Sequence, residues 1–266
     1  MKKITIIGGD NRLKILKKDL LNKGYAVDTL GLYPDDFGDF KTSDIIIFPV
    51  PTTKDGETVF CPLTDRKLKL SEISENISHE HLILSCNYTF ENKKCVDYGA
   101  FDSYALLNAV PTAEGAIKLA IENTPYTIWQ SKILVIGYGR VGKILANRLK
   151  ALGAFVTVSA RKPADFGLLE SLGFDYINTG SLNLNPPKYD IIFNTVDVKV
   201  IDDKTIENIA CDLIIDLSTY GAMSLKKAEE CGIKAIKAPG LPAKIAPETA
   251  AKILSQTVTH IINSYN

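Results

Sequence analysis

The sequence predicts an α/β protein of two Rossmann-like, doubly wound domains with a central cleft, joined by long interdomain helices. In the second half of the chain, short apolar runs alternate with helix-like segments, a pattern typical of parallel strands joined by crossover helices. The first half repeats this alternation less completely. With 266 residues, 45% of them hydrophobic, the chain is long enough for two such domains.

The first half predicts an N-terminal α/β substrate domain at residues 1–110. A helix is expected from the turn after the first strand to about Lys23. The turn itself, Gly8-Gly9-Asp10, lacks the three-glycine spacing of a dinucleotide site, so we expect no nucleotide there. The expected strands are 3–7, 26–30, 44–48 and 81–86.

The second half predicts a doubly wound Rossmann domain at residues 131–242. Its apolar runs have the length of strands, and helix-like segments separate most of them. In such sheets the ligand lies outside the carboxyl ends of the strands, which selects the loops considered below. The expected strands are 132–136, 154–159, 174–177, 190–194, 213–217 and 233–236.

Two helices are expected to connect the domains. Pro111 at a helix start, with Thr112 as N-cap, predicts a helix within an interdomain helix and linker at 111–130. A last amphipathic helix from about Pro247 is long enough to return to the first domain, so segment 245–266 is expected to complete that domain. The active site is then expected in the cleft.

A G-x-G-x-x-G pattern follows the strand at 132–136 and opens an amphipathic helix. Gly137 allows the tight turn, Gly139 lets the backbone approach a pyrophosphate, and Gly142 lets the helix pack on the strand. Glycine turns also join strands and helices without a ligand, but here both flanking elements are present. The predicted cofactor contacts of this turn are Gly137, Tyr138, Gly139, Arg140, Val141 and Gly142.

The end of the next strand indicates which nucleotide is bound. An NAD site usually carries an acidic residue there, whereas this chain has Ser159, Arg161 and Lys162. A hydroxyl and two cations suit a 2′-phosphate, so NADP is predicted, with NAD possible but weaker. The alternative is that both cations are solvated loop charges.

The carboxyl-end rule also selects polar residues for the nicotinamide half and for the substrate. In the second domain, the candidate cofactor contacts are Asn194, Thr195, Val196, Asp216 and Ser218. Capping of a strand end is the alternative role for each of these residues. In the first domain, Arg12 combines a bidentate cation with a helix N-terminus, although a surface salt bridge is its alternative role. The candidate substrate contacts there are Asn11, Arg12, Thr52, Thr53 and Asn87.

Composition excludes several classes of function. The net charge is zero, which argues against nucleic acid as a partner, and no apolar run is long enough to span a membrane. Five scattered cysteines without a C-x-x-C motif fit free thiols in a reducing cytoplasm, and no metal site is expected. A 2-hydroxy-acid dehydrogenase is disfavoured, because the expected histidine and arginine are missing from the second domain's strand ends.

Five segments together resemble the dipicolinate synthase A-subunit family, a sporulation family of spore-forming Firmicutes. The resemblance extends over essentially the whole chain, and the segments are specific as a set although the glycine pattern alone is not. Asn11 is a minor departure from the family pattern. The segments are 7–12, 49–51, 108–115, 137–142 and 238–247.

The resemblance implies that the chain is an NADP-dependent oxidoreductase that oxidises dihydrodipicolinate, from the lysine pathway, to dipicolinate. Because the product ring is aromatic, positioning and one weak base suffice. Glu114 is the candidate proton acceptor, with an interdomain helix-cap carboxylate as its alternative role. Arg12 and Lys244 are the candidate carboxylate ligands, and Thr112 is a further candidate substrate contact.

The resemblance also implies a partner, the flavoprotein-like B subunit, and a location in the mother-cell cytoplasm; a homo-oligomer is expected as well. Two other functions remain open. One is a different NADP-dependent imino- or amino-acid dehydrogenase of similar architecture. The other is a non-catalytic NADPH-binding subunit.

Overall fold

The computed structural model describes residues 2–183, 188–219, 221 and 223–265. Met1 and Asn266, the ends of the predicted segments 1–110 and 245–266, lie outside this part of the chain. The chain forms two compact units. The first unit comprises the residues up to Asn108 and those from Pro242 onward, and the second unit comprises Ala109–Leu241.

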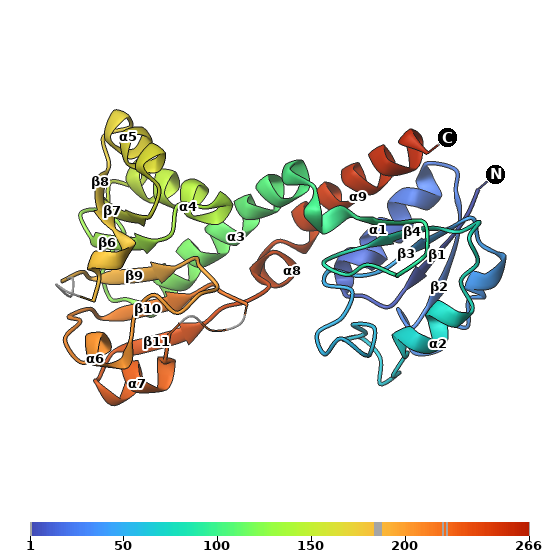
Figure 1. Cartoon of the computed structure of the whole chain (residues 1–266), viewed down its shortest axis with the longest axis horizontal. Coiled ribbons are helices and arrows are strands. Elements are labelled where there is room, and N and C mark those ends of the chain that lie inside the picture. The colour runs from blue at the N-terminus through green and yellow to red at the C-terminus, as the bar shows by residue number, and fades with distance from the viewer. Residues whose placement is uncertain (1, 184–187, 220, 222, 266) are drawn as a thin grey trace. The chain divides into compact units, whose positions relative to one another are not determined.

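The first unit contains a five-stranded parallel sheet in the order β2-β1-β3-β4-β5 (Figure 1). Helices cover both faces of such sheets, so central strands are apolar throughout, as in the fully buried run of β3. The four predicted strands are confirmed, and the sequence missed β5, a short half-buried edge strand. The strands are β1 Lys3–Ile7, β2 Ala26–Leu30, β3 Ile45–Ile47, β4 Leu82–Ser85 and β5 Cys95–Asp97.

Helices α1 and α9 pack against each other in the first unit. In α1, Leu13, Leu16 and Leu20 recur at helical spacing, and all three are buried in one core with Leu254 and Val258 of α9. The last helix thus belongs to the first unit. The helical elements of this unit are α1 Asn11–Asn22, η1 Phe40–Thr42, α2 Leu70–Glu75, η2 Tyr98–Ala100 and α9 Pro247–Ser264.

The second unit contains a six-stranded parallel sheet in the order β11-β10-β9-β6-β7-β8. This is the order of a dinucleotide-binding Rossmann sheet, and the point where the direction of winding reverses lies between β6 and β9. The corresponding point in the first unit lies between β1 and β3. The strands are β6 Lys132–Ile136, β7 Phe155–Ala160, β8 Asp175–Asn178, β9 Ile191–Asn194, β10 Leu213–Asp216 and β11 Lys234–Lys237.

The six strands predicted in the second half are confirmed to within a residue at either end. Helix α4 has buried Leu145, Ala146 and Leu149 on one side, which explains its amphipathic pattern. No described helix is both long enough and apolar enough to cross a membrane. The helical elements are α4 Arg140–Ala151, α5 Pro163–Ser171, η3 Thr179–Ser181, α6 Asp203–Ile206 and α7 Leu225–Glu230.

Helix α3, Asp102–Asn123, and helix α8, Leu241–Ile245, each include residues of both units. The prediction that the connecting helix starts at Pro111 is wrong, because Pro111 lies inside α3. The helix begins at Asp102, whose carboxylate in the first turn favours a helix start. Thr112 is therefore an interior residue of α3 and not its N-cap.

Candidate functional site

The turn after β6 has the geometry that the glycine pattern predicts. Gly137 adopts φ +98°, a conformation that favours glycine. A Cβ at Gly137 would lie 2.5 Å from Val196 Cγ1 and 2.7 Å from Thr195 Oγ1, so the loop after β9 packs directly on this turn. Thr195 also donates a hydrogen bond of 2.8 Å to the carbonyl of Ile136. The turn and the neighbouring loop form one rigid edge.

The start of α4 is tightly packed on one side and open on the other. A Cβ at Gly142 would overlap the carbonyl oxygen of Gly137, which explains why helix and turn need glycine there. Gly139 is the N-cap, and no side chain caps the helix. A Cβ at Gly139 would meet nothing within 4 Å. The first N–H groups of α4 thus have no capping side chain, which is the arrangement that binds phosphate at a helix N-terminus.

The other residues of the glycine turn have distinct environments. Tyr138 is buried, and Lys143 lies 5.1 Å from its ring centroid. Burial, with a smaller effect of Asp165, raises the pKa of Tyr138. Arg140 is exposed at the first position of α4, and Val141 is half-buried. The turn from Gly137 to Gly142 thus carries no carboxylate and no histidine of its own.

The three residues predicted to recognise the 2′-phosphate, at the end of β7, differ in their exposure to solvent. Ser159 is fully buried, and its hydroxyl shares a hydrogen bond of 2.9 Å with Thr179. Arg161 and Lys162 are exposed directly after the strand, and within the described residues neither forms an ion pair. The geometry therefore leaves the two cations available to an anion and removes Ser159 from that role.

The carboxyl ends of β9, β10 and β11 carry a connected polar cluster. Asp216 is fully buried, and its Oδ1 accepts hydrogen bonds from Asn194 Nδ2 at 2.8 Å and from the Ser218 amide at 3.0 Å. Its Oδ2 accepts from Lys237 Nζ at 2.7 Å, and the same ammonium donates to Ser218 Oγ at 2.7 Å. Asn194 Nδ2 also donates to the carbonyl of Val196 at 2.9 Å.

This cluster explains the charge state of Asp216. Burial alone would favour the neutral acid, but hydrogen bonds from Lys237, Ser218 and Asn194 outweigh it and lower the pKa of Asp216. Asn194 and Asp216 thus stabilise the strand ends, the alternative role considered for them. Sequence reasoning missed Lys237, which lies one residue beyond the predicted strand 233–236; the carboxyl-end rule would have selected it had the strand end been placed correctly.

The turn after β1 in the first unit is closed by its own side chains. Asp10 caps α1 by accepting from the Arg12 amide at 3.0 Å. The Arg12 guanidinium, in a residue only 6% exposed, returns to the same carboxylate with Nε at 2.9 Å and Nη2 at 2.7 Å. Nη2 also donates to the carbonyl of Val50 at 2.6 Å, which ties the turn to the loop after β3. Burial opposes the charge of Arg12, but Asp10 raises its pKa nonetheless.

The other polar candidates of the first unit are mostly occupied by its own loops. Thr52 is fully buried and accepts from the Cys86 amide at 2.8 Å. Thr53 donates to Asp55 at 2.9 Å and accepts from the Gly56 amide at 3.0 Å. These contacts give both threonines structural roles. The exposed candidates in this unit are Asn11, Asn87 and Lys244.

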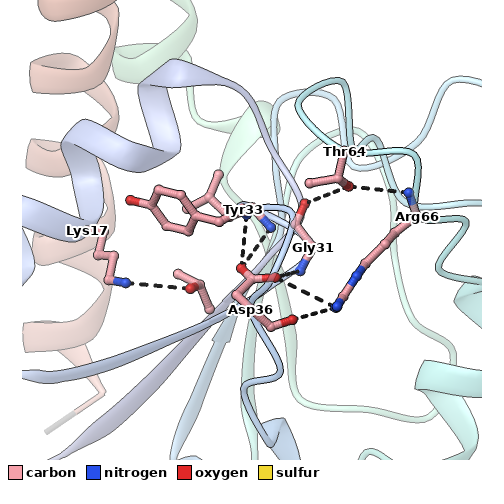
Figure 2. Close-up of polar contacts among 8 residues, drawn as sticks. Lys17, Gly31, Tyr33, Asp36, Thr64 and Arg66 are labelled. Atoms are coloured by element: carbon pink, nitrogen blue, oxygen red, sulfur yellow. Dashed lines mark hydrogen bonds and ion pairs between the residues drawn. The ribbon is translucent and has the colours of Figure 1, made fainter.

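An acidic residue does follow β2 of the first unit, but backbone amides surround it (Figure 2). Asp36 accepts from the amides of Gly31 at 2.6 Å, Leu32 at 3.0 Å and Tyr33 at 3.1 Å. Arg66 donates to the carbonyl of Asp36 and lies 3.7 Å from its carboxylate. This carboxylate holds its own loop and is not presented to a ribose hydroxyl.

Glu114 does not lie at the glycine turn. Its side chain is 59% exposed and forms an ion pair of 2.9 Å with Arg148, in the last turn of α4. Eight residues separate Arg148 from Arg140 at the helix start, which is about 12 Å along the axis. The position of Glu114 does not support its assignment as proton acceptor. It is also no helix cap, because it lies inside α3.

Comparisons with known proteins agree with this architecture. A family model described as the N-terminal domain of the dipicolinate synthase A subunit matches residues 3–106. The A subunit of dipicolinate synthase from Bacillus subtilis is 32% identical, over an alignment that covers 90% of this chain and 89% of that protein. The crystal structure of the corresponding A subunit from Bacillus halodurans aligns with a TM-score of 0.87 at 28% identity, over 98% of this chain and 97% of that one.

A more distant structure shares the fold. The apo-structure of D-lactate dehydrogenase from Escherichia coli aligns with a TM-score of 0.63 at 14% identity, covering 99% of this chain and 96% of that one. At this identity the likeness concerns the fold alone. It agrees with the α/β, Rossmann-like fold class predicted from the sequence.

Proposed function

The chain belongs to the dipicolinate synthase A-subunit family, and we propose that it is an NADP-dependent dehydrogenase that oxidises dihydrodipicolinate to dipicolinate. One observation carries the proposal: the uncapped N-terminus of α4 at Gly139, beside a tightly packed Gly137–Gly142 turn. In the first unit the equivalent helix start is filled by Asp10, so of these two described helix starts it is that of α4 that has the arrangement of a pyrophosphate site.

The second unit's residues fit the cofactor. The α4 amides and the open side of Gly139 would hold the pyrophosphate, and exposed Arg161 and Lys162 would hold a 2′-phosphate. The rigid loop at Thr195 and Val196 would support the nicotinamide half. When bound, NADP supplies a hydride acceptor.

The proposed reaction requires little acid–base chemistry from the protein. Oxidation of the substrate ring would remove one hydride, for which bound NADP would be the acceptor, and one proton, which solvent or a weak base would take. An aromatic pyridine would remain, with both carboxylates unchanged. Positioning then supplies most of the rate enhancement. We propose that Lys244 and Asn11 contact the substrate directly. Arg12 holds the edge of the first unit through Asp10 and Val50, and its Nη1 is not engaged by these contacts.

The proposal extends to the cellular setting. The five free cysteines fit a reducing cytoplasm, and the family's connection to sporulation suggests the mother cell. We further propose that the chain forms a homo-oligomer and associates with a flavoprotein-like B subunit. Co-purification of the two tagged chains, with size-exclusion chromatography of each, would test both assemblies.

The activity is tested with the purified chain, dihydrodipicolinate and NADP⁺, with and without the flavoprotein. The proposal expects absorbance of the pyridine dicarboxylate and of NADPH to rise together with the chain alone, above a protein-free blank. A rise only with the flavoprotein present would indicate a non-catalytic NADPH-binding subunit. NADPH formation from other imino or amino acids, but not from dihydrodipicolinate, would indicate a different dehydrogenase.

A further inference from the structure

Lys237 is a cation held at the ligand-binding edge of the second unit by the sheet itself. It ends β11, directly beside Asp216 at the end of β10 in the strand register. Its Nζ lies 2.7 Å from Asp216 Oδ2 and 2.7 Å from Ser218 Oγ. Both partners are buried, whereas the Lys237 side chain is 32% exposed. The pair therefore has its negative end inside the protein and its positive end toward solvent.

Within the described residues, the ammonium retains capacity for a ligand. A lysine ammonium has three N–H donors, and the contacts with Asp216 and Ser218 account for two of them. Asp216 has no equivalent freedom, because Asn194 and the Ser218 amide occupy its other oxygen. An incoming anion would thus meet the third N–H of Lys237 and not the carboxylate.

The position of this ammonium is fixed relative to the cofactor turn. Lys237 donates a hydrogen bond to Asp216, which also accepts one from Asn194. Asn194 Nδ2 in turn donates to the carbonyl of Val196. Val196 in turn packs on Gly137. Groups held this way lose little entropy when they bind a ligand, so such a chain of contacts suits a substrate-positioning residue.

We propose that Lys237 binds one carboxylate of the substrate, through the third N–H of its ammonium. This inference rests on the proposed function, which supplies a planar ring with two carboxylates as the substrate. It assigns one of those carboxylates to the second unit, on a residue to which sequence reasoning gave no role. A charged hydrogen bond of this kind contributes about 1.5–3 kcal/mol, which corresponds to roughly ten- to a hundred-fold in affinity.

The first test measures the affinity of pyridine-2,6-dicarboxylate for the NADPH-loaded protein by calorimetry. Lys237→Gln should weaken its binding at least tenfold and leave the NADPH affinity within twofold. Lys234→Gln, an exposed lysine on the same strand, is the matched control and should change neither. Equal dicarboxylate binding by wild type and Lys237→Gln would overturn the inference, as would an equal loss of NADPH binding, which would assign Lys237 to the cofactor.

The second test uses the wild-type chain and does not depend on the stability of a variant. Lysines are acetylated with an amine-reactive ester, and modification is read by mass spectrometry. With NADPH present, pyridine-2,6-dicarboxylate should lower modification of Lys237 at least fivefold and leave Lys234 unchanged. Unchanged reactivity of Lys237, or full protection by NADPH alone, would overturn the inference. If the wild type bound no dicarboxylate at all, the proposed function would fail, a result distinct from dicarboxylate binding that Lys237 does not influence.

Discussion

The turn after β1 and the turn after β6 occupy corresponding positions in their two sheets, but they differ in whether a side chain caps the helix that follows. In the first unit, Asp10 caps α1 and binds Arg12, so a carboxylate already occupies the helix N-terminus. In the second unit, Gly139 leaves the N-terminus of α4 without a capping side chain. The same fold therefore presents a capped helix start in one unit and an uncapped one in the other, and an uncapped start is the arrangement that favours anion binding.

The second strands of the two units differ in the same sense. After β2, the carboxylate of Asp36 accepts hydrogen bonds from three backbone amides of its own loop. After β7, Arg161 and Lys162 are exposed without an ion pair in the described part of the chain. The carboxylate after β2 is thus held by its own loop, whereas the two cations after β7 are exposed at the position where a Rossmann fold meets the adenosine ribose of a bound dinucleotide.

The largest effect is expected when the N-cap of α4 is given a carboxylate like that of Asp10 at the N-cap of α1. Gly139→Asp should lower NADPH affinity at least a hundredfold, because the new carboxylate would repel the pyrophosphate. Two unit charges about 4 Å apart repel by about 4 kcal/mol at an effective dielectric constant of about 20. The same change should leave the fold intact, or stabilise it by about 0.5 kcal/mol, because Asp is a good N-cap. Fluorescence titration and thermal unfolding measure the two effects.

Gly139→Asn is the matched control for that substitution, because it has the same shape without the charge. It should reduce NADPH affinity less than the aspartate does. Undiminished NADPH binding by Gly139→Asp would show that the nucleotide does not use this helix start.

Asp216→Asn tests the buried charge at the second edge. It leaves Lys237 without its counter-ion, and since that lysine is 32% exposed we expect a loss of about 2 kcal/mol in unfolding free energy. Urea unfolding can be followed by the fluorescence of Trp129, the single tryptophan of the chain. A loss below about 0.5 kcal/mol would contradict the stabilising role of the cluster.

The same variant gives a pH dependence with a definite sign. Because the folded protein lowers the pKa of Asp216, its ionised form stabilises the fold above the unfolded value of 3.8, and this contribution is lost as pH falls through the folded pKa. The stability difference between wild type and Asp216→Asn should be constant from neutral pH to about 5 and shrink below 3.8. A difference that grows on acidification would contradict this assignment.

Arg161→Ala tests whether the cation that follows β7 distinguishes NADPH from NADH. It should weaken NADPH binding at least tenfold, equivalent to about 1.4 kcal/mol, and leave NADH binding nearly unchanged, because only NADPH carries the 2′-phosphate. Parallel titrations with both nucleotides measure the ratio. Equal losses for the two nucleotides would show that Arg161 does not distinguish them.

The smallest effect is expected at Glu114 of α3, whose ion-pair partner Arg148 lies in the last turn of α4, far from the glycine turn. Glu114→Gln should change kcat less than threefold and stability by less than about 0.5 kcal/mol, because its ion pair with Arg148 is exposed. Arg148→Gln removes the same ion pair and is the matched control. A large fall in kcat for Glu114→Gln alone would restore the carboxylate as the proton acceptor.

The sheets could be predicted from the sequence because short, almost wholly apolar runs mark their central strands, as in β1 and β6. Strand β5 was missed because three half-buried residues give no periodicity. The start of α3 was misplaced because proline usually marks a first turn, whereas Pro111 lies inside the helix. For the same reason Thr112 was assigned a capping role that it does not have.

The candidate site was predictable where backbone geometry decides it and not where side-chain pairing does. Gly137 and Gly142 have the packing that their spacing indicates. Nothing in the spacing of Asp10 and Arg12 shows that they bind each other, or that Ser159 turns inward to Thr179. Ser159 pairs with a residue far along the chain, and Arg12 is held toward Asp10 with the help of the distant carbonyl of Val50, contacts that a local motif does not specify.

The central claim is that a nucleotide binds the second unit's helix start and not the first's. Hydrogen exchange of the wild-type chain, measured by mass spectrometry with and without NADPH, tests it most directly. We predict slower exchange in peptides that span 136–144 and unchanged exchange in peptides that span 8–14. Protection at 8–14 alone, or no protection anywhere at millimolar NADPH, would contradict the account.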